Sequence, residues 1–228
     1  LERSATAEQA LENIVRLLAD YGQGGICGYR DKRMTYHNSY IIADPSESWV
    51  LETAGSLWAA LKIKDYYSIS NTLTIGEAYD ECHPELLKTA RKNGWLKAGQ
   101  TFDFARCYSD WFYTTFSASH HRRQRSSKMV DNSRGVFDVA SAMSILRDHN
   151  DENYRPDTHF LGNRICAHAA NNLARNATQT TGSLIAHLKA GRHTYFATGT
   201  AAPCTGIFKP IRLNHGSLLN IGPTPDGI

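Results

Sequence analysis

The sequence predicts an α+β fold with mainly antiparallel sheets. Three observations lead to this class: closely spaced strand patterns between Tyr36 and Asn71, an amphipathic helix pattern before them, and a return to strand patterns in the last third of the chain. Strands joined by very short turns pair antiparallel. The order of helix, strands, helices and strands also differs from the strand–helix alternation of Rossmann and barrel folds, which argues against both.

The first predicted element is a helix over residues 6–21. Its apolar residues recur at i, i+3, i+4 and i+7, so they form one stripe that we expect to face a sheet. Thr6 is a candidate N-cap, Gln9 follows at the spacing of a capping box, and Gly22 provides the end of the helix. The stripe consists of Leu11, Ile14, Val15 and Leu18.

Four consecutive strands are predicted after this helix. The first two flank Asp44-Pro45-Ser46-Glu47, a strong turn signal because proline presets φ and aspartate can bond its own backbone. A meander this tight must bury at least one face, so we expect it to form the floor of a layered domain. The four strands are SYIIAD (39–44), SWVLET (48–53), LWAALKI (57–63) and YYSISNTLTI (66–75).

Helix patterns fill the middle of the chain, and strand patterns return after it. Pro84 suits the first position of one helix and Gly94 its end. The polar segment 117–135 is predicted to be a flexible loop. Residues 1–228 are predicted to form a single domain. The helices cover 84–93, 103–116 and 137–147, and the later strands cover 165–169, 180–188, 193–199 and 206–213.

The composition is that of a globular protein with a mild positive charge. Of the 228 residues, 41% are hydrophobic and 21% charged, and the formal net charge is +3. Much of the excess lies between His120 and Arg125, which we interpret as a solvated loop. A nucleic-acid surface would have basic residues spread over a face with aromatics between them, so no nucleic-acid partner is expected. No apolar run reaches membrane-spanning length, so no membrane partner is expected either.

The cysteines indicate free thiols. The five are widely spaced, and no CxxC pair occurs. This pattern argues for a reducing compartment, hence a cytoplasmic location, and against a disulfide framework or structural zinc. None of the five has the local signature of a catalytic nucleophile. Cys204 lies in a turn, where it could be exposed, and Cys27 lies in a loop; for each, a structural or incidental thiol is the favoured interpretation.

Two histidine patterns were weighed as metal ligands. His120 and His121 are adjacent, so they would point apart on a helix or strand. Cys166 and His168 are two residues apart, which places them on one face of a strand. Two ligands do not make a site, and satisfied core or edge residues are the favoured interpretation. The sequence therefore predicts no metal site and no cofactor.

Two asparagines are the polar candidates for a site. Asn71 interrupts a strand pattern, where asparagine is depleted, so its amide either bonds within the core or points into a site. An asparagine amide can donate to a developing oxyanion or accept from an amine. Asn38, directly before a strand, is interpreted as part of a turn that starts that strand.

Five stretches of the sequence resemble the secernin/dipeptidase family of cysteine peptidases, which belongs to the N-terminal-nucleophile hydrolases. The similarity runs from residue 1 to about residue 213, and WVLETAG and APCTGIFKP are specific parts of it. The resemblance implies a four-layer αββα sandwich. The stretches are LERSATAEQALENIVRLLADYGQGG (1–25), YHNSYIIADPSESWVLETAG (36–55), SISN (68–71), HPEL (83–86) and FATGTAAPCTGIFKP (196–210).

The resemblance also implies a cysteine-type dipeptidase activity. In this family the thiol of an N-terminal cysteine attacks the amide carbonyl, its own α-amino group acts as base, and water hydrolyses the acyl-enzyme. Asn71 matches a strand asparagine that related enzymes place near the nucleophile, so it is expected to bind substrate or the oxyanion. The substrate would be a dipeptide or small peptide.

No cysteine of this sequence matches the family's nucleophile. We therefore expect the nucleophile upstream of Leu1, an incomplete sandwich, no catalytic residue within 1–228, and no activity of this chain alone. Two alternatives stay open: a non-enzymatic, secernin-like protein that acts in regulated exocytosis, and a related amidase that cleaves non-peptide amides. The sequence does not indicate an oligomeric state.

Overall fold

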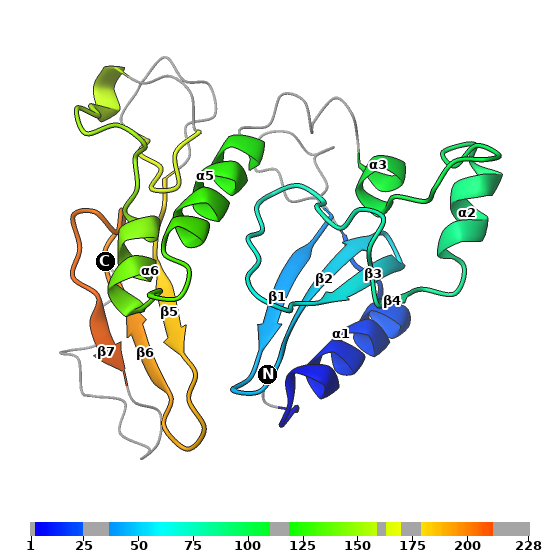
Figure 1. Cartoon of the computed structure of the whole chain (residues 1–228), viewed down its shortest axis with the longest axis horizontal. Helices are drawn as coiled ribbons and strands as arrows, with labels where there is room; N and C mark the ends of the chain where they lie inside the picture. Colours follow the sequence, from blue (N-terminus) through cyan, green and yellow to red (C-terminus); the bar gives the residue numbers. More distant parts are fainter. Residues whose placement is uncertain (1–2, 25–36, 110–118, 159–162, 170–178, 212–228) are drawn as a thin grey trace, which may run out of the picture. The chain divides into compact units, whose positions relative to one another are not determined.

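The computed structural model describes residues 3–24, 37–109, 119–158, 163–169 and 179–211. Helices and antiparallel sheets are mixed along the chain, which confirms the α+β class (Figure 1). The chain divides into two compact units, Leu1–Asp131 (unit 1) and Asn132–Ile228 (unit 2); the single domain over 1–228 stays a prediction of the sequence. Within the described residues, each helix is too short or too polar to cross a membrane.

Helix α1, Ala7–Tyr21, opens unit 1 and confirms the first predicted element. The hydroxyl of Thr6 accepts a hydrogen bond from the backbone N–H of Gln9, at 3.2 Å, and so caps the first turn. At the other end Gly22 adopts φ 71°, and its N–H donates to the carbonyl of Leu18 at 2.9 Å. A left-handed residue at this point suits glycine, which has no Cβ to clash.

The first three strands of the predicted meander are present in the structure. They are β1 (Ser39–Ala43), β2 (Ser48–Ala54) and β3 (Leu57–Lys62), which pair antiparallel in that order. The turn between the first two is closed by Asp44, whose Oδ1 accepts from the backbone N–H groups of Ser46 and Glu47 at 2.6 and 2.9 Å.

The predicted fourth strand, residues 66–75, is wrong. The next strand of the sheet is β4, Glu81–Cys82, which lies opposite Ala59 and Ala60 of β3. At the end of this segment, the backbone N–H groups of residues 74 and 75 bond a side chain instead of a neighbouring strand. The carboxylate of Glu52 accepts from the N–H of Thr74 at 2.6 Å and from that of Ile75 at 2.9 Å.

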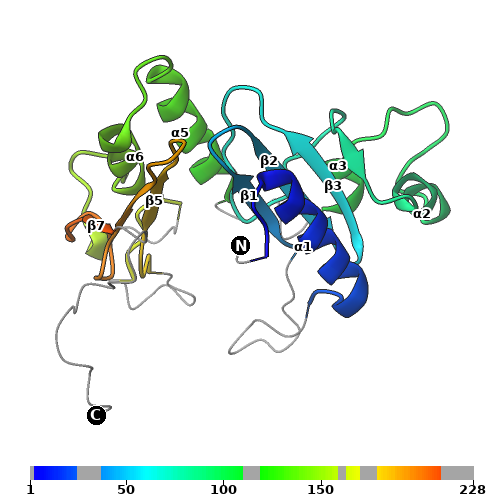
Figure 2. The same ribbon diagram turned by 90° about the horizontal axis from the view of Figure 1, so that it is seen from below.

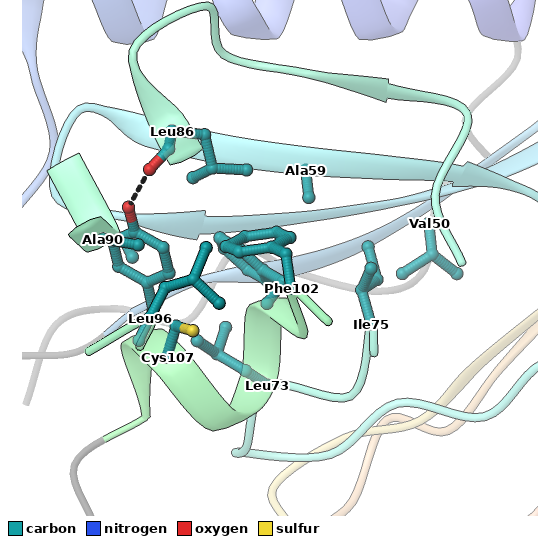
Figure 3. Close-up of a cluster of buried hydrophobic side chains, with 12 residues drawn as sticks. Val50, Ala59, Leu73, Ile75, Leu86, Ala90, Leu96, Phe102 and Cys107 are labelled. Carbon is teal, nitrogen blue, oxygen red and sulfur yellow. Dashed lines mark hydrogen bonds between the residues drawn. The ribbon is translucent and has the colours of Figure 1, made fainter. Parts of the chain in front are cut away.

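The sheet of unit 1 is covered on both faces. One face packs against α1, and Figure 2 shows this helix lying across the strands. The other face packs against residues 73–108, a segment that includes α2 (Leu86–Lys92) and α3 (Phe104–Tyr108). Figure 3 shows this second core, where the hydroxyl of Tyr108 donates to the carbonyl of Leu86 at 2.6 Å. Strand β2 supplies both cores because side chains alternate across a sheet.

Two helices of unit 1 differ from their predicted extents. Helix α3 is shorter than the predicted 103–116, of which 110–116 lie outside the described residues. Helix α5, Ser119–Asn132, occupies most of the segment predicted to be a flexible loop, so that prediction is wrong for 119–132. Its sequence lacks an apolar stripe but is rich in arginine, glutamine and lysine, which have good helix propensity. Polar contacts with residues 66–71 then hold it.

Unit 2 combines α6, Val139–Leu146, with a three-stranded antiparallel sheet. The sheet consists of β5 (Leu184–His187), β6 (Thr194–Ala197) and β7 (Lys209–Ile211), within three of the four predicted strand segments. The fourth prediction, a strand at 165–169, is wrong. Those residues form no strand, because the backbone groups of Cys166 and Ala167 bond Asp148 and Thr180 instead of a neighbouring strand.

Candidate functional site

The predicted site residue Asn71 lies at a bend of unit 1 and is exposed. Its side-chain oxygen Oδ1 accepts a hydrogen bond from Nη2 of Arg122, on α5, at 2.6 Å. An arginine bound to the amide oxygen orients the whole group, since oxygen and nitrogen are fixed on opposite sides of the same carbon. The amide nitrogen Nδ2 is therefore the end of Asn71 that can serve a substrate oxygen.

The segment before and after Asn71 is held by a connected polar network. The guanidinium of Arg123 donates from Nε to the carbonyl of Ser68 at 2.9 Å and lies 5.4 Å from the ring centre of Tyr67. The hydroxyl of Tyr67 lies 3.0 Å from that of Thr74, which donates to Oε1 of Glu52 at 2.6 Å. Ser68 and Ser126 also share a short hydroxyl–hydroxyl hydrogen bond. Helix α5 is thus joined to the floor of the sheet through side chains.

Glu52 is the fully buried end of this network. It accepts three hydrogen bonds of 2.6 to 2.9 Å, from the N–H and hydroxyl of Thr74 and the N–H of Ile75, and a longer one of 3.5 Å from the hydroxyl of Ser39. Burial raises the pKa of Glu52, and it outweighs these hydrogen bonds and the charge of Arg123, which act in the opposite direction. Because the three shorter hydrogen bonds hold residues 74–75 against β2, we assign Glu52 a structural task beside the candidate site.

Asn38 is part of the start of β1, as the sequence predicts. Its backbone carbonyl accepts from the N–H of Thr53 at 2.9 Å, and its Nδ2 donates to Oε1 of Gln23 at 2.5 Å. The hydroxyl of Thr53 donates to the same glutamine oxygen at 2.7 Å. The side chains of Asn38 and Thr53 both donate to Gln23, so Asn38 connects the start of β1 to the residues that follow α1.

The described thiols of unit 1 do not have the surroundings of a nucleophile. Cys107 is buried, and its Sγ lies 3.7 Å from the carbonyl oxygen of Trp95. Burial raises the pKa of the Cys82 thiol, which keeps it protonated. Cys27 lies outside the described residues.

A second candidate site lies in unit 2, where two histidines and two cysteines converge. They are His149, Cys166, His168 and Cys204, and their ligand atoms all lie within 4.8 Å of one another. Cys166 is fully buried and the other three are half-buried. Sequence reasoning identified the pair Cys166 and His168 but set it aside; the structure adds a partner on each side of the pair along the chain.

The contacts within this cluster meet at one atom. Nε2 of His168 lies 3.0 Å from Nε2 of His149, 3.5 Å from Sγ of Cys166 and 3.3 Å from Sγ of Cys204. A ring nitrogen carries either one N–H or one lone pair in the ring plane, so it makes one good hydrogen bond. Three polar atoms around one nitrogen are therefore more than hydrogen bonding can satisfy.

The backbone around the cluster is held by Thr180 and Arg147. Thr180 donates from its N–H to the carbonyl of Ala167 at 3.0 Å, and its hydroxyl accepts from the N–H of Ala167 at 3.0 Å. Its carbonyl accepts from the N–H of Ala202 at 2.7 Å. Arg147 donates to the carbonyls of Pro203 and Gly206 at 3.0 and 2.9 Å. The segments that carry Cys166, His168 and Cys204 are thus fixed to each other.

The protonation states argue against a cysteine–histidine nucleophile in this cluster. Burial raises the pKa of the Cys166 thiol to about 11 and lowers the pKa of both His149 and His168. A catalytic pair needs the reverse, a thiolate stabilised by an imidazolium. These shifts favour the neutral thiol of Cys166 and the neutral imidazoles of His149 and His168, the reverse of a catalytic pair.

Sequence spacing could not reveal this cluster, because only Cys166 and His168 are neighbours in the chain. His149 follows α6, and Cys204 lies between β6 and β7. The local signal that existed was the C-x-H pattern, together with Cys204 in a turn. No family model matches the sequence.

Proposed function

We propose that this chain is part of a cysteine-type hydrolase of the N-terminal-nucleophile class that cleaves the amide bond of dipeptides. The proposal rests on the resemblance of five stretches to the secernin/dipeptidase family. The observation that supports it is the bond between Arg122 and Asn71, which leaves the amide nitrogen of Asn71 able to donate. The α+β class with antiparallel sheets agrees with the coarser part of the fold that the proposal expects.

In this mechanism the nucleophile is an N-terminal cysteine that no residue of 1–228 matches. Its thiol would attack the scissile carbonyl and pass its proton through the α-amino group to the leaving amine, forming a thioester. Water would then hydrolyse the thioester and restore the thiol. Asn71 would donate from Nδ2 to the oxyanion of the tetrahedral intermediates, a contact that strengthens as negative charge develops on that oxygen.

The test uses the natural protein in the form whose mature N-terminus is a cysteine. Dipeptide hydrolysis is measured for that protein and for Asn71→Ala, with Asn93→Ala as a control, because Asn93 is also exposed but lies at the end of α2. Loss of one oxyanion donor is expected to lower kcat about 100-fold. The control is expected to keep full activity.

Three results would contradict the proposal. The first is dipeptidase activity of residues 1–228 that survives substitution of all five cysteines. The second is a mature N-terminus other than cysteine, which would favour the secernin-like role in exocytosis. The third is cleavage of non-peptide amides with no cleavage of dipeptides, which would favour the related amidase.

A further inference from the structure

We propose that His149, Cys166, His168 and Cys204 bind one Zn²⁺ ion in a closed site that stabilises the fold of unit 2. Thiolate sulfur and imidazole nitrogen are the donors that zinc takes in structural sites, and two of each is an established combination. Among divalent metals, a tetrahedral set of two sulfurs and two nitrogens indicates zinc. The proposal does not depend on the hydrolase activity.

The spacing of the four ligand atoms fits a zinc tetrahedron. Zn–S bonds of about 2.3 Å and Zn–N bonds of about 2.0–2.1 Å place the ligand atoms of a tetrahedron about 3.3 to 3.8 Å apart. The three distances from Nε2 of His168 are 3.0, 3.3 and 3.5 Å, and all four atoms lie within 4.8 Å of one another. Small movements would therefore bring all four ligands to bonding distance of one ion.

The ligands come from three separate segments, so one ion would cross-link them. His149 follows α6, Cys166 and His168 lie in the irregular segment 163–169, and Cys204 lies in the turn between β6 and β7. The N–H of Cys166 donates to the carbonyl of Asp148 at 3.1 Å, next to His149, which already holds two of these segments together. With all four positions filled by protein, such a site has no place for substrate and is structural.

Backbone conformation next to the ligands is unusual at two places. Asn150, directly after His149, has φ 57°, and Ala202, two residues before Cys204, has φ 64°. Alanine rarely adopts a left-handed conformation, because its Cβ is crowded there. Such positions persist only where the surroundings impose them, and they concentrate at functional sites.

Unit 2 has little hydrophobic core of its own within the described residues. Both clusters of buried hydrophobic residues belong to unit 1. Helix α6 has no buried residue. The buried apolar residues of the described part of unit 2 are Cys166, Ile185, Ala202, Pro203 and Phe208. Small units that bury this little apolar surface commonly depend on a metal or disulfides for stability.

The test measures metal in the full chain, purified under reducing conditions. Mass spectrometry of the elements is expected to find about one zinc per chain. After removal by a chelator, added Co²⁺ is expected to produce the thiolate charge-transfer band and the intense visible bands of a tetrahedral site. Amide hydrogen exchange is measured after the metal is removed and again after Co²⁺ is added. Removal of the metal is expected to abolish the protection of backbone amides in β5 and β6 and to leave the protection of β1–β3 unchanged.

Matched variants identify the ligands. Cys204→Ser and His168→Gln are expected to lose the metal. Cys82→Ser and His187→Gln are the controls, since these residues lie outside the cluster, and both are expected to keep it. Cys204→His replaces one ligand by another, so it is expected to bind Co²⁺ with roughly half the thiolate band. Amide protection of β1–β3 is measured in each variant as well. If it is unchanged, unit 1 is still folded and the substitution has affected unit 2 alone.

Three outcomes would overturn the proposal. The first is a reduced wild-type chain that takes up neither Zn²⁺ nor Co²⁺. The second is metal content that does not change in Cys204→Ser and His168→Gln, which would place the metal elsewhere. The third is a disulfide between Cys166 and Cys204 in the freshly isolated protein, because both thiolates would then be consumed.

Discussion

Nε2 of His168 lies 3.3 Å from Sγ of Cys204, although 36 positions separate the two residues in the sequence. Thr180 links the two segments: it bonds the backbone of Ala167, next to His168, and that of Ala202, two residues before Cys204. It brings the C-x-H pattern at 166–168 together with the turn at 204, and His149 completes a set of four zinc-type ligands. The candidate metal site is therefore a product of tertiary structure.

Thr180→Val is expected to weaken metal binding by about tenfold, because groups that orient metal ligands contribute to affinity. The substitution removes the hydroxyl that accepts from the N–H of Ala167, between Cys166 and His168. Thr181→Val is the matched control, since this neighbouring threonine is exposed. Zinc competition with a chelating indicator measures both, and equal affinities would show that Thr180 does not position the ligands.

Glu52→Gln is expected to lower the free energy of unfolding by about 1–3 kcal/mol. Glutamine keeps the size of the side chain but has one acceptor oxygen. With that oxygen in the place of Oε2, the N–H groups of Thr74 and Ile75 keep their acceptor, and the hydroxyl of Thr74 loses the acceptor Oε1. Glu77→Gln, at an exposed position, is the control. Urea unfolding measures the change, and a variant as stable as the wild type would contradict the structural task of Glu52.

The pH dependence of stability is expected to report the same residue. Burial raises the pKa of Glu52, so the native state keeps its proton to higher pH than the unfolded chain does, whose value is near 4.5. The stability that this pKa shift contributes to the native state is therefore fully present below pH 4.5, and it is lost as pH rises through the native pKa of Glu52. The stability difference between wild type and Glu52→Gln should fall across this window. A difference that grows with pH would reverse the sign of the assigned shift.

Asp44 is expected to affect the pH dependence of stability in the opposite direction to Glu52, and Asp44→Asn tests this. Hydrogen bonds from the backbone N–H groups of Ala7, Ser46 and Glu47 lower the pKa of Asp44 below its ordinary 3.8. The stability that these bonds contribute is present above that value and is lost as pH falls through the native pKa. Acid unfolding should therefore be less steep in Asp44→Asn. Asp20→Asn, on the exposed side of α1, should match the wild type.

Much of unit 1 could be predicted from local patterns. The stripe of Leu11 to Leu18, the cap at Thr6 and the turn at Asp44 are properties of short segments, and the structure confirms each. The prediction of a strand at 66–75 was wrong for a non-local reason. The backbone of Thr74 and Ile75 bonds Glu52, which lies more than twenty positions earlier in the sequence.

Helix α5 and the metal ligands were missed for a related reason. Arg122 and Arg123 make a polar segment that suits a loop, yet their contacts with Asn71 and Ser68 hold it as a helix. The four ligands of unit 2 come from three segments, so no single stretch has the spacing of a zinc motif. In the sequence, only the C-x-H pair could be recognised. Two candidate ligands alone do not distinguish a metal site from two buried core residues.

The most direct test of the metal site is X-ray absorption at the zinc edge of the purified full chain, because it measures the bonds themselves. A first shell of two sulfurs at about 2.3 Å and two nitrogens at about 2.0–2.1 Å is the expected result. A shell of oxygen and nitrogen without sulfur would contradict the account, since neither Cys166 nor Cys204 would then bind the ion.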